Sequence, residues 1–154
     1  MIPISFSYLI FLLALAPKFH ILKEPSQNQL ILYIEGWTMA RIVVLDDDEI
    51  VRNVVVRTLE LDRHTVQAFP DARPALEQVD FDQVDLVITD LSMPTPGEIA
   101  IRTLRSRGIQ IPILVMSGHV EEDKARYLIS LGAQQIINKP FSLKNLLNVV
   151  QTLI

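Results

Sequence analysis

Polar side chains suited to ionic chemistry follow four of the apolar segments of this 154-residue chain, at the point where each segment ends. In chain order they are Asp46, Asp47, Asp90, Ser117 and Lys139. Carboxylates crowded at the end of one strand repel one another, so such a cluster requires a cation or bound protons to be stable. The acids, the hydroxyl and the lysine together point to a functional site.

The segments that carry these side chains have the length and composition of buried strands. Residues 43–45, 86–88 and 113–115 are continuously apolar, which is typical of a parallel sheet covered on both faces. Segments with helical spacing of apolar residues separate them. We predict strands at 42–45, 65–69, 86–89, 113–116 and 135–138, and helices ending at 61 and spanning 71–79, 98–107, 121–131 and 143–153.

This order predicts an α/β domain of the doubly wound (βα)5 flavodoxin-like type, with a central five-stranded parallel sheet, over residues 39–154. Ligands of such folds bind outside the carboxyl ends of the strands, where the polar side chains above fall. Asp48, Asp71 and Ser142 are predicted to cap the helices that follow them, and Gly132 to end the fourth helix.

Residues 1–38 differ from the domain and are predicted to be a separate extension. Residues 2–16 are almost entirely apolar. A membrane-spanning helix needs about 20 apolar residues, and no lysine or arginine precedes this run as in a secretory signal. Either translation starts at Met39, or the extension is a signal or anchor; the sequence leaves both open. We expect a cytoplasmic location, with membrane anchorage left open.

The composition excludes several classes of site. The chain has no cysteine, which excludes disulfides, thiolate catalysis and cysteine-ligated zinc. Its three histidines lack metal-ligand spacing. A net charge of −4, without a run of lysine or arginine, argues against nucleic-acid binding by this domain.

Residues 41–154 resemble the receiver domain of two-component response regulators. The resemblance rests on four pieces in the family's order and at matching intervals: residues 43–48, Asp90 followed by Met93-Pro94, Ser117-Gly118, and residues 139–141. Each piece alone is weak, but the combination over a whole domain is specific. Because the chain ends with the last predicted helix, the resemblance is to a stand-alone, chemotaxis-regulator-like receiver.

The resemblance implies a Mg²⁺ site. Asp47 would be a direct ligand and Asp46 would act largely through water. Asp90 and the backbone carbonyl of Ser92 would complete the protein's ligands. Mg²⁺ bridging carboxylates and phosphoryl oxygens is the usual arrangement in phosphoryl transfer.

The resemblance also implies that Asp90 is the phosphoacceptor. Lys139 would face the phosphoryl group and neutralise part of its charge, and the Lys139–Pro140 bond would be cis. Ser117 would be the switch hydroxyl. An aspartyl phosphate carries about −1.5 to −2 charge and three acceptor oxygens. A hydrogen bond from Ser117 to one of them would draw the following loop inward and bias a two-state surface.

The implied function is that of a signalling switch in a phosphorelay. A sensor histidine kinase or a histidine phosphotransfer protein would donate the phosphoryl group, and a downstream protein would respond to the conformational change. The domain would catalyse only its own phosphorylation and dephosphorylation and would not be a metabolic enzyme. A homodimer is left open.

Two features depart from the family pattern. Many receivers have tyrosine or phenylalanine three residues before the lysine, and here the residue is Ile136. The loop after Asp90 is one residue shorter than usual and lacks the acid before Gly97. We expect the acceptor geometry to be intact and the partner-facing loop to differ.

Two other classes of function stay open. A haloacid-dehalogenase-like phosphatase also uses a nucleophilic aspartate, Mg²⁺, a hydroxyl and a lysine, and residues 46–50 approximate its signature. That mechanism requires further acids after the lysine, and residues 140–154 contain none. The third class is an interaction module that is never phosphorylated, against which the full set of site residues argues.

Overall fold

The computed structural model of the chain describes residues 19–23, 30–34 and 39–154. The chain divides into two units, residues 1–37 and 38–154. In the first unit, β1 (Phe19–Lys23) pairs antiparallel with β2 (Leu30–Ile34), a pairing that the sequence did not predict. The signal or anchor considered for residues 2–16 lies outside the described residues. No helix in the described ranges is long and apolar enough to cross a bilayer.

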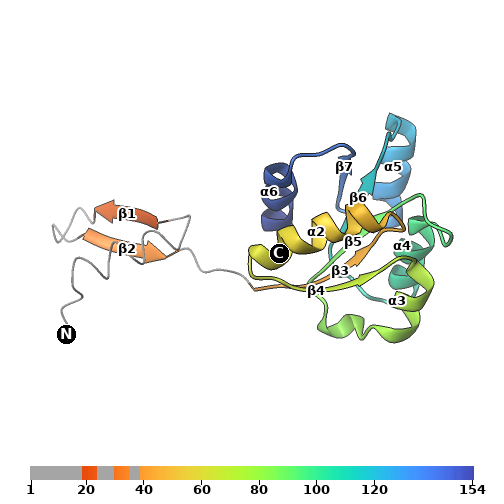
Figure 1. Cartoon of the computed structure of the whole chain (residues 1–154), viewed down its shortest axis with the longest axis horizontal. Coiled ribbons are helices and arrows are strands. Elements are labelled where there is room, and N and C mark those ends of the chain that lie inside the picture. Colours follow the sequence, from red (N-terminus) through yellow and green to blue (C-terminus); the bar gives the residue numbers. More distant parts are fainter. Residues whose placement is uncertain (1–18, 24–29, 35–38) are drawn as a thin grey trace. The chain divides into compact units, whose positions relative to one another are not determined.

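The second unit contains a five-stranded sheet in which every neighbouring pair of strands is parallel (Figure 1). Its strand order is β4-β3-β5-β6-β7, in which the chain first winds outward to one edge and then to the other. The strands are β3 (Arg41–Leu45), β4 (Thr65–Phe69), β5 (Leu86–Asp90), β6 (Ile113–Ser117) and β7 (Gln135–Asn138). The predicted doubly wound fold is therefore confirmed.

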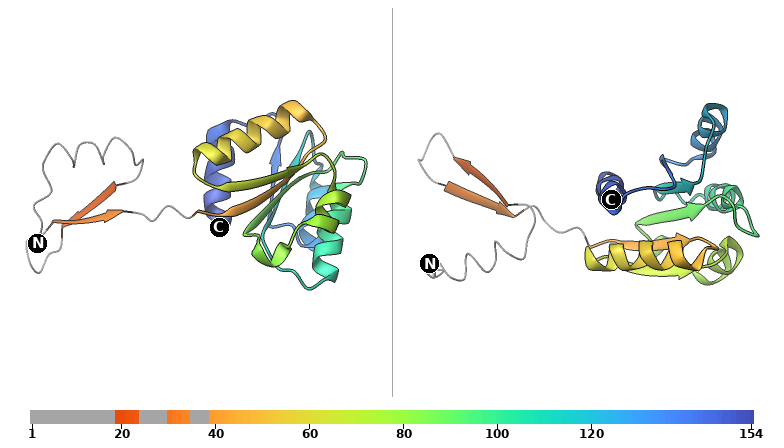
Figure 2. Two further views of the ribbon diagram at one scale, coloured as in Figure 1. Left: turned by 60° about the horizontal axis from the view of Figure 1, so that its bottom comes forward. Right: turned by 45° about the horizontal axis from the view of Figure 1, so that its top comes forward.

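Five α-helices follow the five strands and cover both faces of the sheet (Figure 2). They are α2 (Glu49–Leu61), α3 (Ala72–Gln78), α4 (Gly97–Ser106), α5 (Glu122–Leu131) and α6 (Leu143–Leu153). A short 3-10 helix, η1 (Phe81–Gln83), precedes β5 and was not predicted. The hydrogen-bonded N-caps predicted at Asp48, Asp71 and Ser142 are present, and Gly132 ends α5 with φ 111°.

Each central strand sends alternate side chains into two separate apolar cores. Along β3, Val43 and Leu45 pack with α3 and α4, whereas Ile42 and Val44 pack with α2 and α6. All five residues of β5 and all five of β6 are buried. Because both faces of these strands are covered, polar groups can reach solvent only where the strands end.

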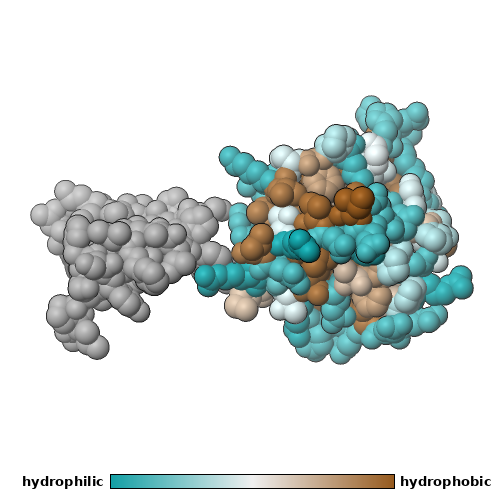
Figure 3. Space-filling view, viewed as in Figure 1, coloured by the Kyte–Doolittle hydropathy of each residue, from teal (hydrophilic) through white to brown (hydrophobic). Residues whose placement is uncertain are grey.

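One face of α2 stays apolar and exposed. Its side chains Ile50, Val54 and Leu61 are 77%, 44% and 86% exposed, and four- and seven-residue spacings place them on one side of the helix. Figure 3 shows this side of the molecule, with hydrophobic side chains gathered over α2. The stripe begins two residues after Asp48, so it runs away from the acidic segment that precedes α2.

Gly97 allows α4 to start directly against the end of β5. A Cβ atom at this position would lie 2.1 Å from the carbonyl oxygen of Asp90 and 2.8 Å from Oγ1 of Thr89. No side chain fits there unless the backbone shifts. The loop between β5 and α4 is anchored further by Met93, which is 6% exposed and belongs to the core shared with α3 and α4.

We predict that Gly97→Ala destabilises the domain by about 1–3 kcal/mol, because overpacking against backbone forces strands and helix apart. Urea unfolding measures the change. Gly118→Ala is the matched control, since a Cβ at Gly118 meets no atom within 4 Å and its φ is not left-handed. Equal unfolding midpoints for the two variants would contradict the close approach at Gly97.

Candidate functional site

The carboxyl edge of the sheet collects polar side chains from four strands. Asp46 directly follows β3, Asp90 and Ser117 are the last residues of β5 and β6, and Lys139 directly follows β7. Parallel strands end at one edge, which is why residues far apart in the chain meet there. Asp46, Asp90 and Ser117 are buried, with exposed fractions of 0%, 4% and 5%.

The ammonium group of Lys139 joins the two buried carboxylates. Its Nζ donates to Oδ2 of Asp46 and to Oδ1 of Asp90, at 2.8 Å in each case. The backbone N–H of Lys139 donates to the carbonyl of Ser117 at 2.6 Å, and the predicted cis Lys139–Pro140 bond is present. One residue thus connects the ends of β3, β5 and β6.

Backbone N–H groups hold the remaining oxygen of each carboxylate. Asp48 N donates to Oδ1 of Asp46 at 2.9 Å, and Ser92 N donates to Oδ2 of Asp90 at 2.6 Å. Hydrogen bonds to charged groups contribute about 1.5–3 kcal/mol each, whereas an unpaired buried charge costs several kcal/mol. These bonds are therefore what allows two carboxylates to stay buried side by side.

Burial and pairing shift the pKa values of this cluster. Burial raises the pKa of the Asp46 carboxyl above its ordinary value of 3.8, although Lys139 and the Asp48 N–H act in the opposite direction. Burial acts to lower the pKa of Lys139, but its hydrogen bonds to Asp46 and Asp90 outweigh this and leave the pKa raised. The raised pKa of Lys139 favours its charged form, whereas the raised pKa of Asp46 favours its neutral form. The two differ because complete enclosure penalises the charge of Asp46 more than that of Lys139, although pairing favours both charges.

The carboxylate and carbonyl oxygens at this edge are suitable ligands for a hard divalent cation. The two buried carboxylates of Asp46 and Asp90 face one ammonium group, which leaves a formal charge of −1. Asp47 is exposed, and its carboxylate makes no hydrogen bond or ion pair within the described residues. Carboxylate and carbonyl oxygens are the ligands that Mg²⁺ prefers. In the part of the chain that the structure describes, no three acidic or histidine side chains are gathered around one point, so Asp47 does not join Asp46 and Asp90.

Sequence reasoning missed two residues that hold this edge in place. Arg52, one turn into α2, donates from Nη1 to the carbonyl of Asp46 at 2.7 Å and lies 3.4 Å from that of Asp47. Asp71 accepts a hydrogen bond from Thr95 N at 2.8 Å, in the loop after Asp90. Neither contact has a signal in the sequence, because each joins a side chain to backbone that only the fold brings near.

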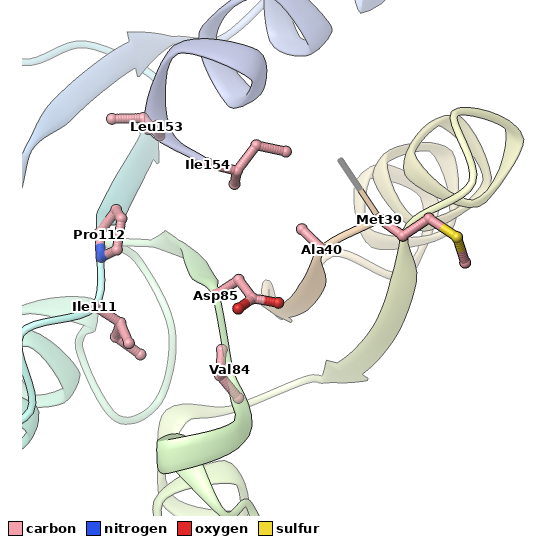
Figure 4. Close-up of a pocket in the computed structure, with 8 residues that line it drawn as sticks. All are labelled: Met39, Ala40, Val84, Asp85, Ile111, Pro112, Leu153 and Ile154. Carbon is pink, nitrogen blue, oxygen red and sulfur yellow. The ribbon is translucent and has the colours of Figure 1, made fainter. Parts of the chain in front are cut away.

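A second concave region lies at the opposite edge of the sheet. It is a cavity of about 390 Å³ formed where β3, β5 and β6 begin and where α6 ends (Figure 4). Its lining residues are Met39, Ala40, Val84, Asp85, Ile111, Pro112, Leu153 and Ile154. None of the polar side chains collected at the carboxyl edge reaches it, so it takes no part in their chemistry.

Comparison with known proteins confirms the fold described above and the family that the sequence motifs resemble. Residues 42–151 match the family model described as "Response regulator receiver domain". The chain is similar to the response regulator MprA of Mycolicibacterium vanbaalenii, with 34% identity over 115 residues, which covers 74% of this chain and 50% of that protein. The same regulator of Mycobacterium leprae is 33% identical over 115 residues. The chain thus spans about half the length of these curated relatives.

Solved structures agree with this result. The chemotaxis response regulator CheY4 of Vibrio cholerae is 28% identical, with a TM-score of 0.71, and the match covers 76% of this chain and 100% of that one. A signal receiver domain from Bermanella marisrubri is 29% identical, with a TM-score of 0.67 and coverage of 75% and 98%. The resemblance drawn from the sequence motifs is confirmed.

We predict that Asp46→Asn is more stable than the unmodified chain at neutral pH. The raised pKa means that folding favours the neutral form of Asp46, so its charged form costs stability at any pH above the folded-state pKa. The difference in urea midpoint should shrink as the pH falls through that pKa and stop changing with the titration of Asp46 below the ordinary value of 3.8.

Asp48→Asn is the matched control, since it removes an exposed charge from the same segment and keeps a good N-cap. At neutral pH it should not show the higher midpoint that is expected for Asp46→Asn. A lower midpoint for Asp46→Asn at neutral pH would mean that pairing with Lys139 outweighs the cost of burial.

Proposed function

Because this chain belongs to the response regulator receiver family of two-component systems, we propose that it is a phosphorylatable switch with Asp90 as the acceptor. Receiver domains are signalling domains, and response regulator relatives imply a histidine kinase as partner. The observation that carries the proposal is the Lys139 ammonium group between the buried carboxylates of Asp46 and Asp90. In this proposal the donor is a sensor histidine kinase or a histidine phosphotransfer protein, and the domain works in the cytoplasm.

The transfer is a substitution at phosphorus. An oxygen of Asp90 forms the new P–O bond, and the P–N bond of the donor phosphohistidine breaks with its electron pair passing to the imidazole nitrogen. Lys139 already contacts Oδ1 of Asp90, so its charge is in place for the phosphoryl oxygens. Most of the catalysis of phosphoryl transfer comes from such positioning and charge neutralisation.

Receiver domains generally bind Mg²⁺ at an acidic pocket. In this proposal Asp46, Asp47, Asp90 and the Ser92 carbonyl hold the ion, with Asp46 acting largely through water. Bound Mg²⁺ would neutralise charge shared between the carboxylates and the phosphoryl oxygens. The excess of carboxylates over ammonium groups supports this assignment, because another cation is required to balance it.

Ser117 is the proposed switch hydroxyl. Its carbonyl is already bonded to Lys139 N at 2.6 Å, and no hydrogen bond of its hydroxyl occurs within the described residues, so the hydroxyl has capacity for a phosphoryl oxygen. Ile136 takes the place of the aromatic residue common in the family, so we propose that the signal passes through the segment from Ser117 to α5 without a ring rotation. A downstream protein would recognise the altered surface.

The exposed apolar stripe of α2 supports a protein as the donor. It begins beside Asp48, directly after the acidic segment, so a helix packed on Ile50 and Val54 would bring its phosphohistidine towards Asp90.

The phosphatase alternative is disfavoured by the residues that follow the lysine. That mechanism would use Asp46 as the nucleophile and requires further acids after Lys139, and residues 140–154 contain none. The interaction-module alternative predicts no phosphorylation at all. Phosphorylation of the unmodified chain and of Asp90→Asn therefore separates the receiver, the phosphatase and the interaction module.

We predict that the chain gains one phosphoryl group from acetyl phosphate in the presence of Mg²⁺. Intact mass spectrometry detects the addition, which EDTA should abolish. Asp90→Asn should abolish labelling, because an amide is a poor nucleophile and cannot form the acyl phosphate.

Asp85→Asn is the matched control, since Asp85 lies at the opposite edge of the sheet and should label normally. Labelling that persists in Asp90→Asn would show that another residue is the nucleophile, and Asp46 would then be the candidate, as in the phosphatase alternative. No labelling of the unmodified chain by acetyl phosphate or by a phosphorylated histidine phosphotransfer protein would favour the interaction module.

We predict that Ser117→Ala is phosphorylated but does not switch. The substitution removes the hydroxyl that would bond a phosphoryl oxygen and leaves Asp90 and Lys139 in place. Amide chemical shifts of α5, recorded with beryllofluoride as a phosphoryl mimic, measure the response. Wild-type shift changes in Ser117→Ala would show that the conformational signal does not depend on this hydroxyl.

A further inference from the structure

The loop between β5 and α4 carries the backbone that the proposed phosphorylation site uses. Ser92 N donates to Asp90 at 2.6 Å, and the Ser92 carbonyl is the proposed metal ligand. The loop is short and rich in proline, and Ser92 itself is exposed. Something must therefore fix the course of this backbone, because an exposed segment has few packing contacts of its own.

A carboxylate from another element bonds the backbone of this loop. Oδ2 of Asp71 accepts a hydrogen bond from Thr95 N at 2.8 Å, across 24 residues of sequence. Its other oxygen, Oδ1, accepts from Arg73 N at 2.8 Å and caps α3. One side chain thus has two separate tasks, a local cap and a tether to the acceptor loop.

The tether completes a set of fixed points along the loop. Met93 is buried in the core, and Gly97 lies against the Asp90 carbonyl, so the loop is held on both sides of Thr95. Between those points, the bond from Thr95 to Asp71 restrains the loop on the side of α3. Restraint at three successive points leaves little freedom for the backbone around Ser92.

We propose that Asp71 is a positioning residue for the phosphorylation site: through Thr95 N–H it holds the loop after β5 so that the Ser92 backbone lies where Asp90 and the metal ion require it. This inference rests on the proposed function and adds to it a residue that touches neither phosphate nor metal.

The ionisation of Asp71 supports this role. Burial acts to raise its pKa, but the N–H groups of Arg73 and Thr95, with the Thr95 hydroxyl, outweigh it and leave the pKa lowered. The carboxylate is therefore charged at neutral pH. Hydrogen bonds to a charged acceptor are about twice as strong as those between neutral groups.

The test separates the two tasks of Asp71. In Asp71→Ser the hydroxyl still caps α3, because serine is as good an N-cap as aspartate, but a single, shorter acceptor cannot also reach Thr95. Asp80→Ser is the matched control: Asp80 caps η1 by accepting from Asp82 N, a bond that does not involve the loop. Both variants are made in the whole chain.

Two readouts are taken by NMR, neither of which depends on phosphorylation. Hydrogen exchange of the Thr95 amide reports the tether, and a Mg²⁺ titration followed at the Ser92 amide reports the metal site. We expect faster exchange at Thr95 in Asp71→Ser, together with about a ten-fold rise in the Mg²⁺ midpoint, the lower end of the effect of losing an outer-shell partner. Asp80→Ser should match the unmodified chain, and the urea midpoint of Asp71→Ser should stay close to it.

A wild-type Mg²⁺ midpoint in Asp71→Ser with faster Thr95 exchange would overturn the proposal, because the tether would then exist without positioning the site. A fall in stability large enough to account for the weaker binding would overturn it as well. If Asp71→Ser does not fold, Asp71→Thr carries the same test, since a β-branched residue suits the extended backbone at this position (φ −154°, ψ 152°). Absence of Mg²⁺ binding by the unmodified chain would count against the proposed function instead, and Thr95 exchange would still report whether the tether exists.

Discussion

Repulsion between carboxylates at the carboxyl edge of the sheet, balanced by a single ammonium group, is the interaction on which the site depends. Asp46 is completely buried and Asp90 nearly so, and both bond Lys139 at 2.8 Å. In a low-dielectric setting each charge strongly affects its neighbours, so removing any member changes the balance for the others. Burial raises the pKa of Asp46 despite its bonds to Lys139 and to the Asp48 N–H, because desolvation of its charge outweighs this pairing.

The rest of the domain serves to keep these groups together. The parallel sheet brings the ends of β3, β5, β6 and β7 to one edge, and two cores of close-packed side chains keep the strands in register. Tight contacts then fix the connecting loops: Gly97 against Asp90, Arg52 on the carbonyl of Asp46, and Asp71 on Thr95. These contacts reach backbone atoms, so they constrain the direction of the loops and not only their distance from the sheet. A cluster that is held rigidly and is short of positive charge is sensitive to a bound cation or phosphoryl group.

Most of the fold followed from the sequence, because its signals were local. Continuous apolar segments located the central strands, and alternation with helical patterns fixed the parallel topology. The cap residues Asp48 and Ser142 marked helix starts correctly, since capping acts between neighbours in the chain. The 3-10 helix before β5 and the pairing of β1 with β2 were missed, as neither has strong periodicity.

The sequence by itself determined the family, the fold and the set of polar residues at the strand ends, because residue type and spacing suffice for these. Only the tertiary structure decided how the residues share their contacts: that Lys139 lies between Asp46 and Asp90, that Asp47 stands apart from them, and that Asp71 reaches the acceptor loop. Spacing along the chain carries no information about these contacts. They depend on burial, on the directions of side chains and on backbone groups of distant segments, which exist only once the sheet has assembled.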